Sequence, residues 1–146
     1  MDTKISLLNS INTKQANEIS ILSDQLGYKS DENETLNHIE KIIARKDNCI
    51  FITVENETIV GWIHAFYTIR VETKPFIEIA GLVVHHEYRK QQIGKNLIKA
   101  VAIWAETYYC DQISVRCNEI RSETHQFYMN LGFKLNKKQL VFELRS

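Results

Sequence analysis

The stretch that decides the fold is Val83-Val84-His85-His86-Glu87-Tyr88-Arg89-Lys90-Gln91-Gln92-Ile93-Gly94-Lys95. An apolar run, residues 77–84, leads into it, and a long amphipathic pattern follows. A strand that passes through a polar turn into a helix collects unpaired backbone N–H groups at one point, with the positive end of the helix dipole behind them. Arg89, Lys90 and Lys95 add positive charge there. The stretch therefore predicts a binding site for a pyrophosphate group.

Hydrophobic periodicity predicts helices and strands along the whole chain. Strands are expected at residues 4–8, 50–54, 59–70, 76–84 and 113–117, with two more within 133–144. Helices are expected after a capping arrangement at Asn12 and Gln15, from Ser30, at 92–108 and at 122–131, with Gly27 and Gly132 as stops. The helix between the strands 76–84 and 113–117 predicts that these two strands pair in parallel. The order β-α-α-β-β-β-α-β-α-β-β predicts a mixed sheet with helices on both faces.

Composition narrows the class of protein. The chain has 146 residues, which suits one domain over residues 1–146, and 18 basic side chains balance 18 acidic ones. This balance favours neither a nucleic-acid partner nor an anionic membrane. No leader or membrane-length apolar run is visible. Three cysteines without metal-type spacing predict a reduced, cytoplasmic protein with no metal site.

Two motifs, in this order, resemble the GNAT superfamily of acetyl-CoA-dependent N-acetyltransferases. The family pattern Arg/Gln-x-x-Gly/Ala-x-Gly/Ala after a central strand corresponds to Arg89-Lys90-Gln91-Gln92-Ile93-Gly94. The second motif is Asn118, followed by Phe127-Tyr128-Met129-Asn130-Leu131-Gly132-Phe133. The element order is similar to that family over essentially the whole chain. The resemblance implies an α/β fold of the α+β type, with a mixed, mostly antiparallel sheet of about seven strands and about four helices on its two faces.

The resemblance also implies acetyl-CoA as the cosubstrate. The backbone of residues 82–84 would pair with the pantetheine arm as an added strand, and the amides of residues 90–95 would hold the pyrophosphate. Asn118 would hydrogen-bond the cofactor arm. The cofactor-binding residues expected on this basis are Leu82, Val83, Val84, Arg89, Lys90, Gln91, Gln92, Ile93, Gly94, Lys95, Asn118 and Tyr128.

Gln92 departs from the family pattern, which usually has glycine or alanine at this position. A side chain here would crowd the pyrophosphate only if it pointed inward, so we expect weaker cofactor affinity at most. Gly94 is retained where the helix backbone must come close to the phosphates.

Two residues are the candidate catalytic groups. Tyr128 matches the family's tyrosine near the sulfur and would protonate the departing thiolate, since its reference pKa of about 10 keeps it protonated at neutral pH. A packing role is the alternative. Glu78 falls where the family's histone acetyltransferases carry a catalytic glutamate, and it would act as general base toward an amine with a pKa of about 10.4. Water could replace it as the base, and Glu78 would then only attract a cationic substrate.

The acceptor site is less well marked. Trp62, His64 and Phe66 share one face of the strand 59–70 by its period of two, either as core or as the wall of an acceptor pocket. Tyr28 lies between the first two helices, where relatives shape the acceptor site. The substrate-binding candidates are Tyr28, Trp62, His64 and Glu78.

The sequence thus predicts an N-acetyltransferase that moves an acetyl group to a primary amine of a small molecule or peptide by direct attack in a ternary complex. The backbone amide of Val83 or Val84 would polarise the thioester oxygen. The alternative is a non-catalytic CoA-binding regulatory module, which Gln92 favours and the set of Glu78, Asn118 and Tyr128 disfavours. Exposed C-terminal strands would allow a homodimer.

Overall fold

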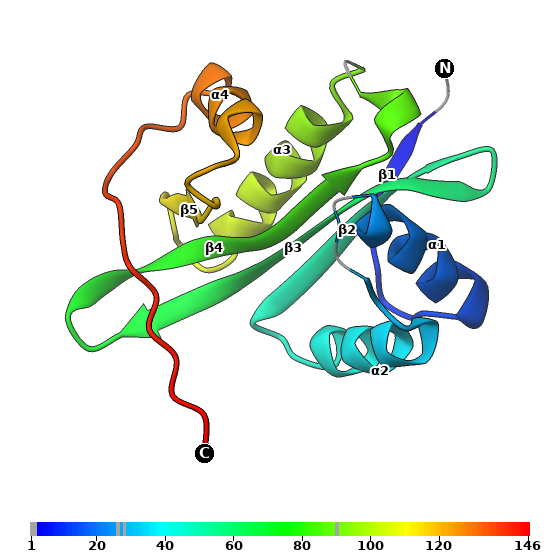
Figure 1. Ribbon diagram of the computed structural model, residues 1–146, viewed down its shortest axis with the longest axis horizontal. Coiled ribbons are helices and arrows are strands. Elements are labelled where there is room, and N and C mark those ends of the chain that lie inside the picture. Colours follow the sequence, from blue (N-terminus) through cyan, green and yellow to red (C-terminus); the bar gives the residue numbers. More distant parts are fainter. Residues whose placement is uncertain (1–2, 26, 28, 90) are drawn as a thin grey trace. The chain divides into compact units, whose positions relative to one another are not determined.

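The computed structural model describes residues 3–25, 27, 29–89 and 91–146. Within them the chain forms four α-helices, one 3-10 helix and five strands (Figure 1). These elements fall into two compact units, residues 1–115 and residues 116–146. The four helices were predicted correctly, whereas the expectation of about seven strands was wrong. One domain over residues 1–146 stays a prediction.

The first unit is built on a five-stranded sheet with the order β1-β2-β3-β4-β5. The strands are β1 (Lys4–Leu7), β2 (Asn48–Glu55), β3 (Thr58–Arg70), β4 (Thr73–Val84) and β5 (Ile113–Val115). Neighbours from β1 to β4 are antiparallel, and β5 is parallel to β4. The mixed, mostly antiparallel sheet and the parallel pair are confirmed. The helix α3 (Ile93–Glu106) makes the crossover that a parallel pair requires.

Two helices, α1 (Thr13–Asp24) and α2 (Glu32–Ile43), follow β1. The predicted capping at the start of α1 is present, because Asn12 Oδ1 accepts from Gln15 N–H at 2.8 Å and Gln15 Oε1 accepts from Asn12 N–H at 3.1 Å. The helix ends before Gly27, which has a φ of 88° and donates its N–H to Asp24 O at 2.9 Å. The glycine therefore follows the last turn rather than closing it.

The helices cover both faces of the sheet, as the element order predicted. Neighbouring residues of a strand point to opposite faces. At Gly61 of β3 an added Cβ would meet Ile93 Cγ2 at 3.1 Å and Leu97 Cδ1 at 3.4 Å, so this face packs on α3. Trp62 packs on the other face with α1 and α2, against a core cluster of Leu8, Ile19, Leu22, Ile39, Ile50, Ile52, Ile59 and Val83.

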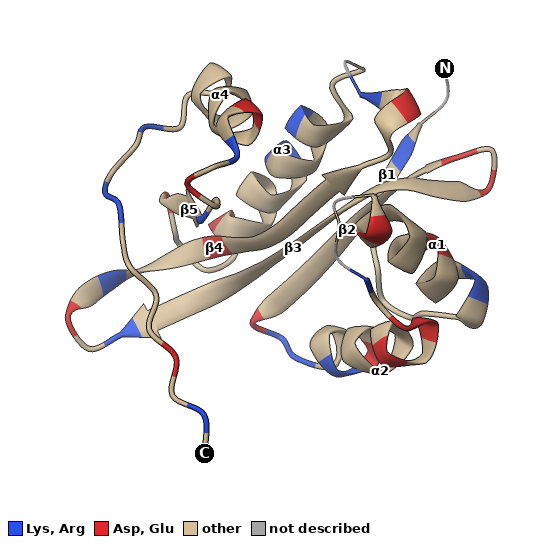
Figure 2. Cartoon of the chain, viewed as in Figure 1, with Lys and Arg blue, Asp and Glu red and all other residues tan. Residues whose placement is uncertain are grey.

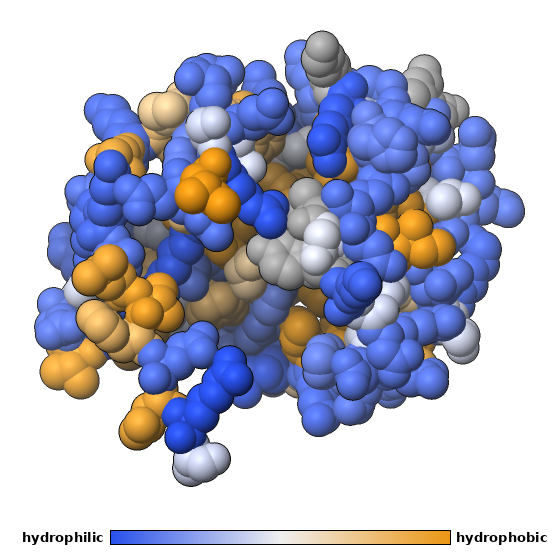
Figure 3. All heavy atoms as spheres, in the orientation of Figure 1, coloured by the Kyte–Doolittle hydropathy of each residue, from blue (hydrophilic) through white to orange (hydrophobic). Residues whose placement is uncertain are grey.

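The second unit contains the helix α4 (Ser122–Asn130), followed by a segment without regular structure in residues 133–146. The two strands predicted within 133–144 are therefore not formed. Apolar residues alternate there as in a strand, but a strand also needs a partner for its backbone groups. Leu140, Phe142 and Leu144 are instead 83%, 88% and 99% exposed. Apolar side chains interrupt the polar surface along this segment (Figure 3).

Candidate active site

The edge of β4 opens next to β5. The two strands pair only at Ile77 with Ile113, Glu78 with Ser114 and Ile79 with Val115. Beyond Ile79, β4 continues through residues 80–84, which have no β5 partner among the described residues. An open strand edge can accept an extended ligand as an additional strand. The geometry therefore suits the pantetheine arm that the sequence predicted at Leu82, Val83 and Val84.

The peptide groups along this edge alternate in direction. His85 donates its N–H to Val60 O in β3 at 2.8 Å. In an antiparallel pair the groups of every second residue point to the same neighbour, so those of Val83 also face β3. Those of Leu82 and Val84 face the open edge. Val84, rather than Val83, is thus oriented to donate its N–H to a carbonyl oxygen of a ligand at this edge.

A short turn, whose backbone is held by side-chain hydrogen bonds, connects β4 to α3. Its 3-10 helix η1 (His86–Tyr88) is capped by His85 Nδ1, which accepts from Glu87 N–H at 3.1 Å. Gln25, at the end of α1, accepts the N–H of His86 through Oε1 at 3.2 Å. The turn is therefore anchored from two sides, which fixes the entry into α3.

The N-terminus of α3 is open for an anion. Gln92 precedes the helix in the left-handed conformation, with φ 62° and ψ 17°, and its side chain makes no capping hydrogen bond. Gln92 O accepts the first helical bond, from Asn96 N–H at 3.0 Å. The N–H groups of residues 93–95 have no intrahelical acceptor. At the N-terminus of α1, the side chain of Asn12 accepts a hydrogen bond from a backbone N–H of the first turn. At the N-terminus of α3, the side chain of the N-cap residue makes no such bond.

Positive charge surrounds this N-terminus. Arg89 and Lys95 are exposed, and Arg89 Nε donates to Val84 O at 3.4 Å. Figure 2 shows Lys and Arg positions in blue on the turn before α3 and on α3 itself. Gln91 and Gln92 are also exposed, whereas Gly94 is buried against the sheet. Lys90 lies outside the described residues. The free amides and the exposed positive charge are compatible with the predicted pyrophosphate cradle, which stays a prediction.

One face of the sheet carries the acceptor-site candidates. The register pairs Trp62 with Val83, His64 with Gly81 and Phe66 with Glu78. Residues that are directly paired across two strands share a face. Trp62, His64 and Glu78 therefore lie on one face, the side that α1 and α2 partly cover. Tyr28, the fourth candidate, lies outside the described residues.

A hollow of about 140 Å³ lies on this face. It is lined by Ile19, Ser23, Thr35, His38, Ile39, Ile42, Ile50, Trp62 and His64. The indole Nε1 of Trp62 is buried and has no hydrogen-bond partner within the described part of the chain. Sites for drug-sized ligands measure about 300–1,000 Å³, so this hollow suits one small group of an acceptor. Another hollow, of about 220 Å³, contains none of the predicted site residues.

Glu78 is ion-paired on the face that carries the acceptor-site candidates. Its Oε1 lies 3.6 Å from Nη2 of Arg70, and only 14% of its side chain is exposed. The guanidinium of Arg70 also lies over the ring of Phe76, 5.3 Å from the centroid. Sequence analysis missed Arg70, because its contact with Glu78 depends on the register of β3 and β4. The carboxylate predicted as general base thus carries a cation partner.

Tyr128, in the second unit, is buried at 7% exposure. Burial, and to a smaller extent the neighbouring Cys117, raises the pKa of Tyr128 above its usual value. Its hydroxyl therefore stays protonated at neutral pH. Burial also raises the pKa of the Cys117 thiol, which disfavours a thiolate nucleophile there.

The end of α4 fixes Tyr128 through a Schellman motif. Phe133 donates its N–H to Tyr128 O at 3.0 Å, and Gly132 donates to Met129 O at 3.0 Å. Gly132 has a φ of 99°, which glycine adopts without strain. The rings of Phe133 and Tyr128 make an edge contact at 5.3 Å. The Phe-Tyr-x-x-x-Gly-Phe motif thus has a structural basis.

Asn118 organises the turn before α4. Its Oδ1 accepts from Ile120 N–H at 3.1 Å, and its carbonyl accepts from His125 Nε2 at 2.8 Å and from Arg121 N–H at 3.0 Å. The side chain itself is exposed. A contact of Asn118 with the cofactor arm stays a prediction.

Among the described residues, no helix is long and apolar enough to cross a membrane. Within the same residues, no group of three or more His, Cys, Asp or Glu side chains could hold a metal ion.

Comparisons with known proteins bear on the class of enzyme. The sequence model of the acetyltransferase (GNAT) family matches residues 16–133. A curated relative, aminoglycoside N(6')-acetyltransferase type 1 of Acinetobacter baumannii, is 26% identical over 77 residues, which are 53% of either chain. The match therefore spans about half the length of that relative.

Solved structures are similar over the whole chain. The aminoglycoside 6'-N-acetyltransferase AAC(6')-Ih from Acinetobacter baumannii has a TM-score of 0.86, with 19% identity over 99% of both chains. AAC(6')-Iy, in complex with the bisubstrate analogue CoA-S-monomethyl-acetylneamine, has a TM-score of 0.84, with 18% identity over 100% of both chains. At these identities the likeness shows the fold.

The fold and these comparisons define an acyltransferase. The chain belongs to the acetyltransferase (GNAT) family, as the match over residues 16–133 shows.

Proposed function

We propose that this protein transfers an acetyl group from acetyl-CoA to a primary amine of a small molecule or peptide, by direct attack in a ternary complex. The observation that carries the proposal is the open edge of β4 at residues 80–84, followed by the uncapped N-terminus of α3. The edge suits an extended arm and the helix N-terminus suits an anion, which are two parts of one CoA molecule. The complex of AAC(6')-Iy with a CoA-containing analogue supports this choice of cosubstrate.

Acetyl-CoA would supply the activated acetyl thioester. Val84 N–H would donate to the carbonyl oxygen, which gains negative charge during the attack. Asn118 would hold the cofactor arm. Glu78, directly or through water, is the base predicted from the sequence, and solvent water alone is the alternative.

Tyr128 would donate to the departing sulfur. Burial raises its pKa, whereas a thiol has a reference pKa of about 8.5. Full proton transfer from Tyr128 to a thiolate is therefore uphill, and a hydrogen bond to the sulfur is the easier contribution. Either way the phenolic O–H is the group that a Phe substitution removes.

Aminoglycosides are the first acceptors to test, because the similar proteins named above are aminoglycoside N-acetyltransferases. The acceptor face of this chain carries Trp62, His64 and a Glu78 that is already paired with Arg70. Such a face holds little unpaired negative charge for a polycation. Amines of lower charge, including peptide lysines, therefore belong in the same panel.

Thiol release after mixing with acetyl-CoA tests the function. The panel should contain aminoglycosides, polyamines, amino-acid derivatives and a lysine peptide, each with an amine-free control. Acceptor-dependent release of one thiol per acetylated amine would support the proposal. Binding of CoA without turnover on any amine would favour the regulatory module instead.

We also propose that two copies of the chain pair through residues 134–145. Leu140, Phe142 and Leu144 alternate with Val141 and Glu143 there, which is the pattern of a strand with one apolar face. The large apolar residues of this segment are 73–99% exposed: Leu135, Leu140, Val141, Phe142 and Leu144.

A cytoplasmic location is part of the same proposal. Cys49, Cys110 and Cys117 are all free thiols. Free thiols persist in reducing compartments, which supports a location in the cytoplasm.

A further inference from the structure

A chain of hydrogen bonds fixes which nitrogen of His64 carries the proton. His64 Nε2 lies 2.7 Å from Asn48 Oδ1. An amide oxygen can only accept, so Nε2 carries the hydrogen. The amide cannot be turned around, because Asn48 Nδ2 donates to Asp47 Oδ1 at 2.8 Å. The lone pair of the neutral imidazole is therefore on Nδ1.

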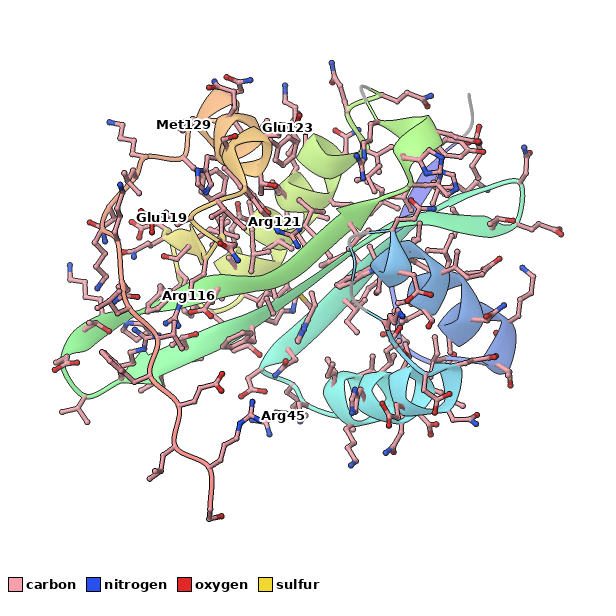
Figure 4. The ribbon with its side chains drawn as sticks, viewed as in Figure 1. Arg45, Arg116, Glu119, Arg121, Glu123 and Met129 are labelled. Atoms are coloured by element: carbon pink, nitrogen blue, oxygen red, sulfur yellow. The ribbon has the colours of Figure 1, made fainter. Side chains whose placement is uncertain are left out.

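The series of hydrogen bonds that starts at His64 ends at the negatively charged carboxylate of Asp47. Arg45, labelled in Figure 4, donates Nε to Asp47 Oδ1 and Nη2 to Asp47 Oδ2, both at 3.2 Å. These bonds, with that from Asn48, lower the pKa of Asp47, so the carboxylate is ionised at neutral pH. A carboxylate that acts through an amide orients the imidazole and stabilises its protonated form.

His64 lies in the hollow that the proposed function assigns to the acceptor amine. It lines the 140 Å³ hollow beside Trp62, and its partner across β4 is Gly81, which has no side chain to cover it. Among the described residues, none forms a hydrogen bond with Nδ1. Burial lowers the pKa of His64, so the ring is neutral at physiological pH.

Other titratable groups face His64 from the elements packed around it. Just before β2 this is Asp47, through Asn48, and on α2 it is His38, which lines the same hollow. On β4 it is Glu78 with its partner Arg70. From α1 the hollow is lined by uncharged residues. Among these groups, His64 alone has one imidazole nitrogen held by a hydrogen-bonded amide and carboxylate.

We propose that His64 is the general base of the acetyl transfer, and that Glu78, paired with Arg70, orients the cationic amine instead. This rests on the proposed function. His64 Nδ1 takes one proton from the ammonium group, directly or through one water. The freed nitrogen lone pair forms the C–N bond as the C–S bond breaks, and sulfur leaves with the bonding electrons while it accepts a hydrogen bond from Tyr128. The second nitrogen proton reaches the sulfur through solvent, and the imidazolium releases its proton, so one proton is produced for each acetyl group transferred.

The test is the pH dependence of kcat/KM of the full chain, from pH 6 to 10, with acetyl-CoA and the best acceptor of the panel. His64→Gln can still donate to Asn48 but has no basic nitrogen. We expect it to lose about 100-fold in kcat/KM at pH 7, within the usual range for a general base, and to recover as the free amine fraction rises. CoA affinity, measured by calorimetry, should stay as in the wild type, which also shows that the variant is folded.

Three variants separate the role of His64 from those of its neighbours. Glu78→Gln should raise KM for the acceptor and keep the acid limb of the profile, which is the fall of kcat/KM toward low pH. His38→Gln, the other imidazole of the hollow, should also keep that limb. Asn48→Ala removes the acceptor of Nε2–H, so the limb should shift while CoA binding is retained.

A His64→Gln variant with the acid limb of the wild type would overturn the proposal, as would loss of the limb in Glu78→Gln alone. Failure of the proposed function looks different, since the wild type itself would then release no thiol with any amine. Titration of the imidazole nitrogens by ¹⁵N NMR adds a readout that needs no turnover. It should show Nε2–H as the neutral tautomer, and Nδ1–H would contradict the proposal.

Discussion

The indole of Trp62 in β3 lies over Gly81 in β4. A Cβ added to Gly81 would stand 2.9 Å from Trp62 Cη2 and 3.1 Å from Cζ3. Real side chains do not approach this closely, so either the ring or β4 would have to move. The register of the two strands also shifts here, between His64 and Ala65. The bare backbone at Gly81 thus makes room for the Trp62 ring, close to the start of the open edge of β4.

Gly81→Ala should therefore destabilise the protein. Forcing an extra methyl group into packed surroundings costs about 1–3 kcal/mol, which urea unfolding would measure. Because β4 also carries Leu82 and Val84, affinity for CoA should fall as well. In the double variant with Trp62→Phe, which lacks the clashing atoms, the added loss from Gly81→Ala should shrink. Equal losses in both backgrounds would show that the contact does not matter.

Gln92→Gly should relieve strain at the entry to α3. Gln92 has a φ of 62°, and the left-handed region costs a non-glycine residue roughly 1–2 kcal/mol. The free energy of unfolding should rise by up to about 1 kcal/mol, since glycine also gains freedom in the unfolded chain. Calorimetric affinity for CoA should stay the same or increase. Gln91→Gly, at a neighbour outside the left-handed region, is the matched control and should give no gain. A marked loss of affinity in Gln92→Gly would mean that its side chain contacts the cofactor.

Tyr128→Phe should lower kcat more than it weakens CoA binding. Loss of a general acid typically costs about 100-fold or more in rate. Burial raises the folded-state pKa of Tyr128 above its reference of about 10, so the hydroxyl keeps its proton at every pH up to about 10. Any basic limb that belongs to Tyr128 should thus lie above that pH in a kcat profile. A wild-type rate in Tyr128→Phe would leave the residue with a packing role.

Local signals predicted the parts of the fold that depend on neighbours in sequence. Asn12 and Gln15 cap α1 because the capping box joins residues three positions apart. Gly132 ends α4 because only its left-handed φ allows the Schellman bonds. The C-terminal strands failed for the opposite reason. The alternation of apolar and polar residues shows which side chains would share a face of a strand. It does not show which other strand would pair with its backbone.

In the candidate site, too, the sequence predicted what depends on neighbouring residues and missed what depends on distant ones. Period two placed Trp62 and His64 on one face of β3, which the register bears out. The partners that decide their chemistry, Asn48 for His64 and Arg70 for Glu78, come from strand register and hairpin geometry. Neither has a sequence motif, so they became visible only in the structure.

The proposed pairing of two C-terminal segments leads to a prediction about mass in solution. The wild type should sediment at twice the 17.1 kDa of one chain at micromolar concentration. Replacing Leu140, Phe142 and Leu144 by lysine puts three positive charges on the apolar face, and burial of unpaired charge is costly, so this variant should be a monomer. Gln139→Lys with Glu143→Lys adds the same net charge on the other face and should remain a dimer. A wild type that is monomeric at every concentration would rule out the pairing, and dissociation of both variants would trace the effect to charge rather than to the apolar face.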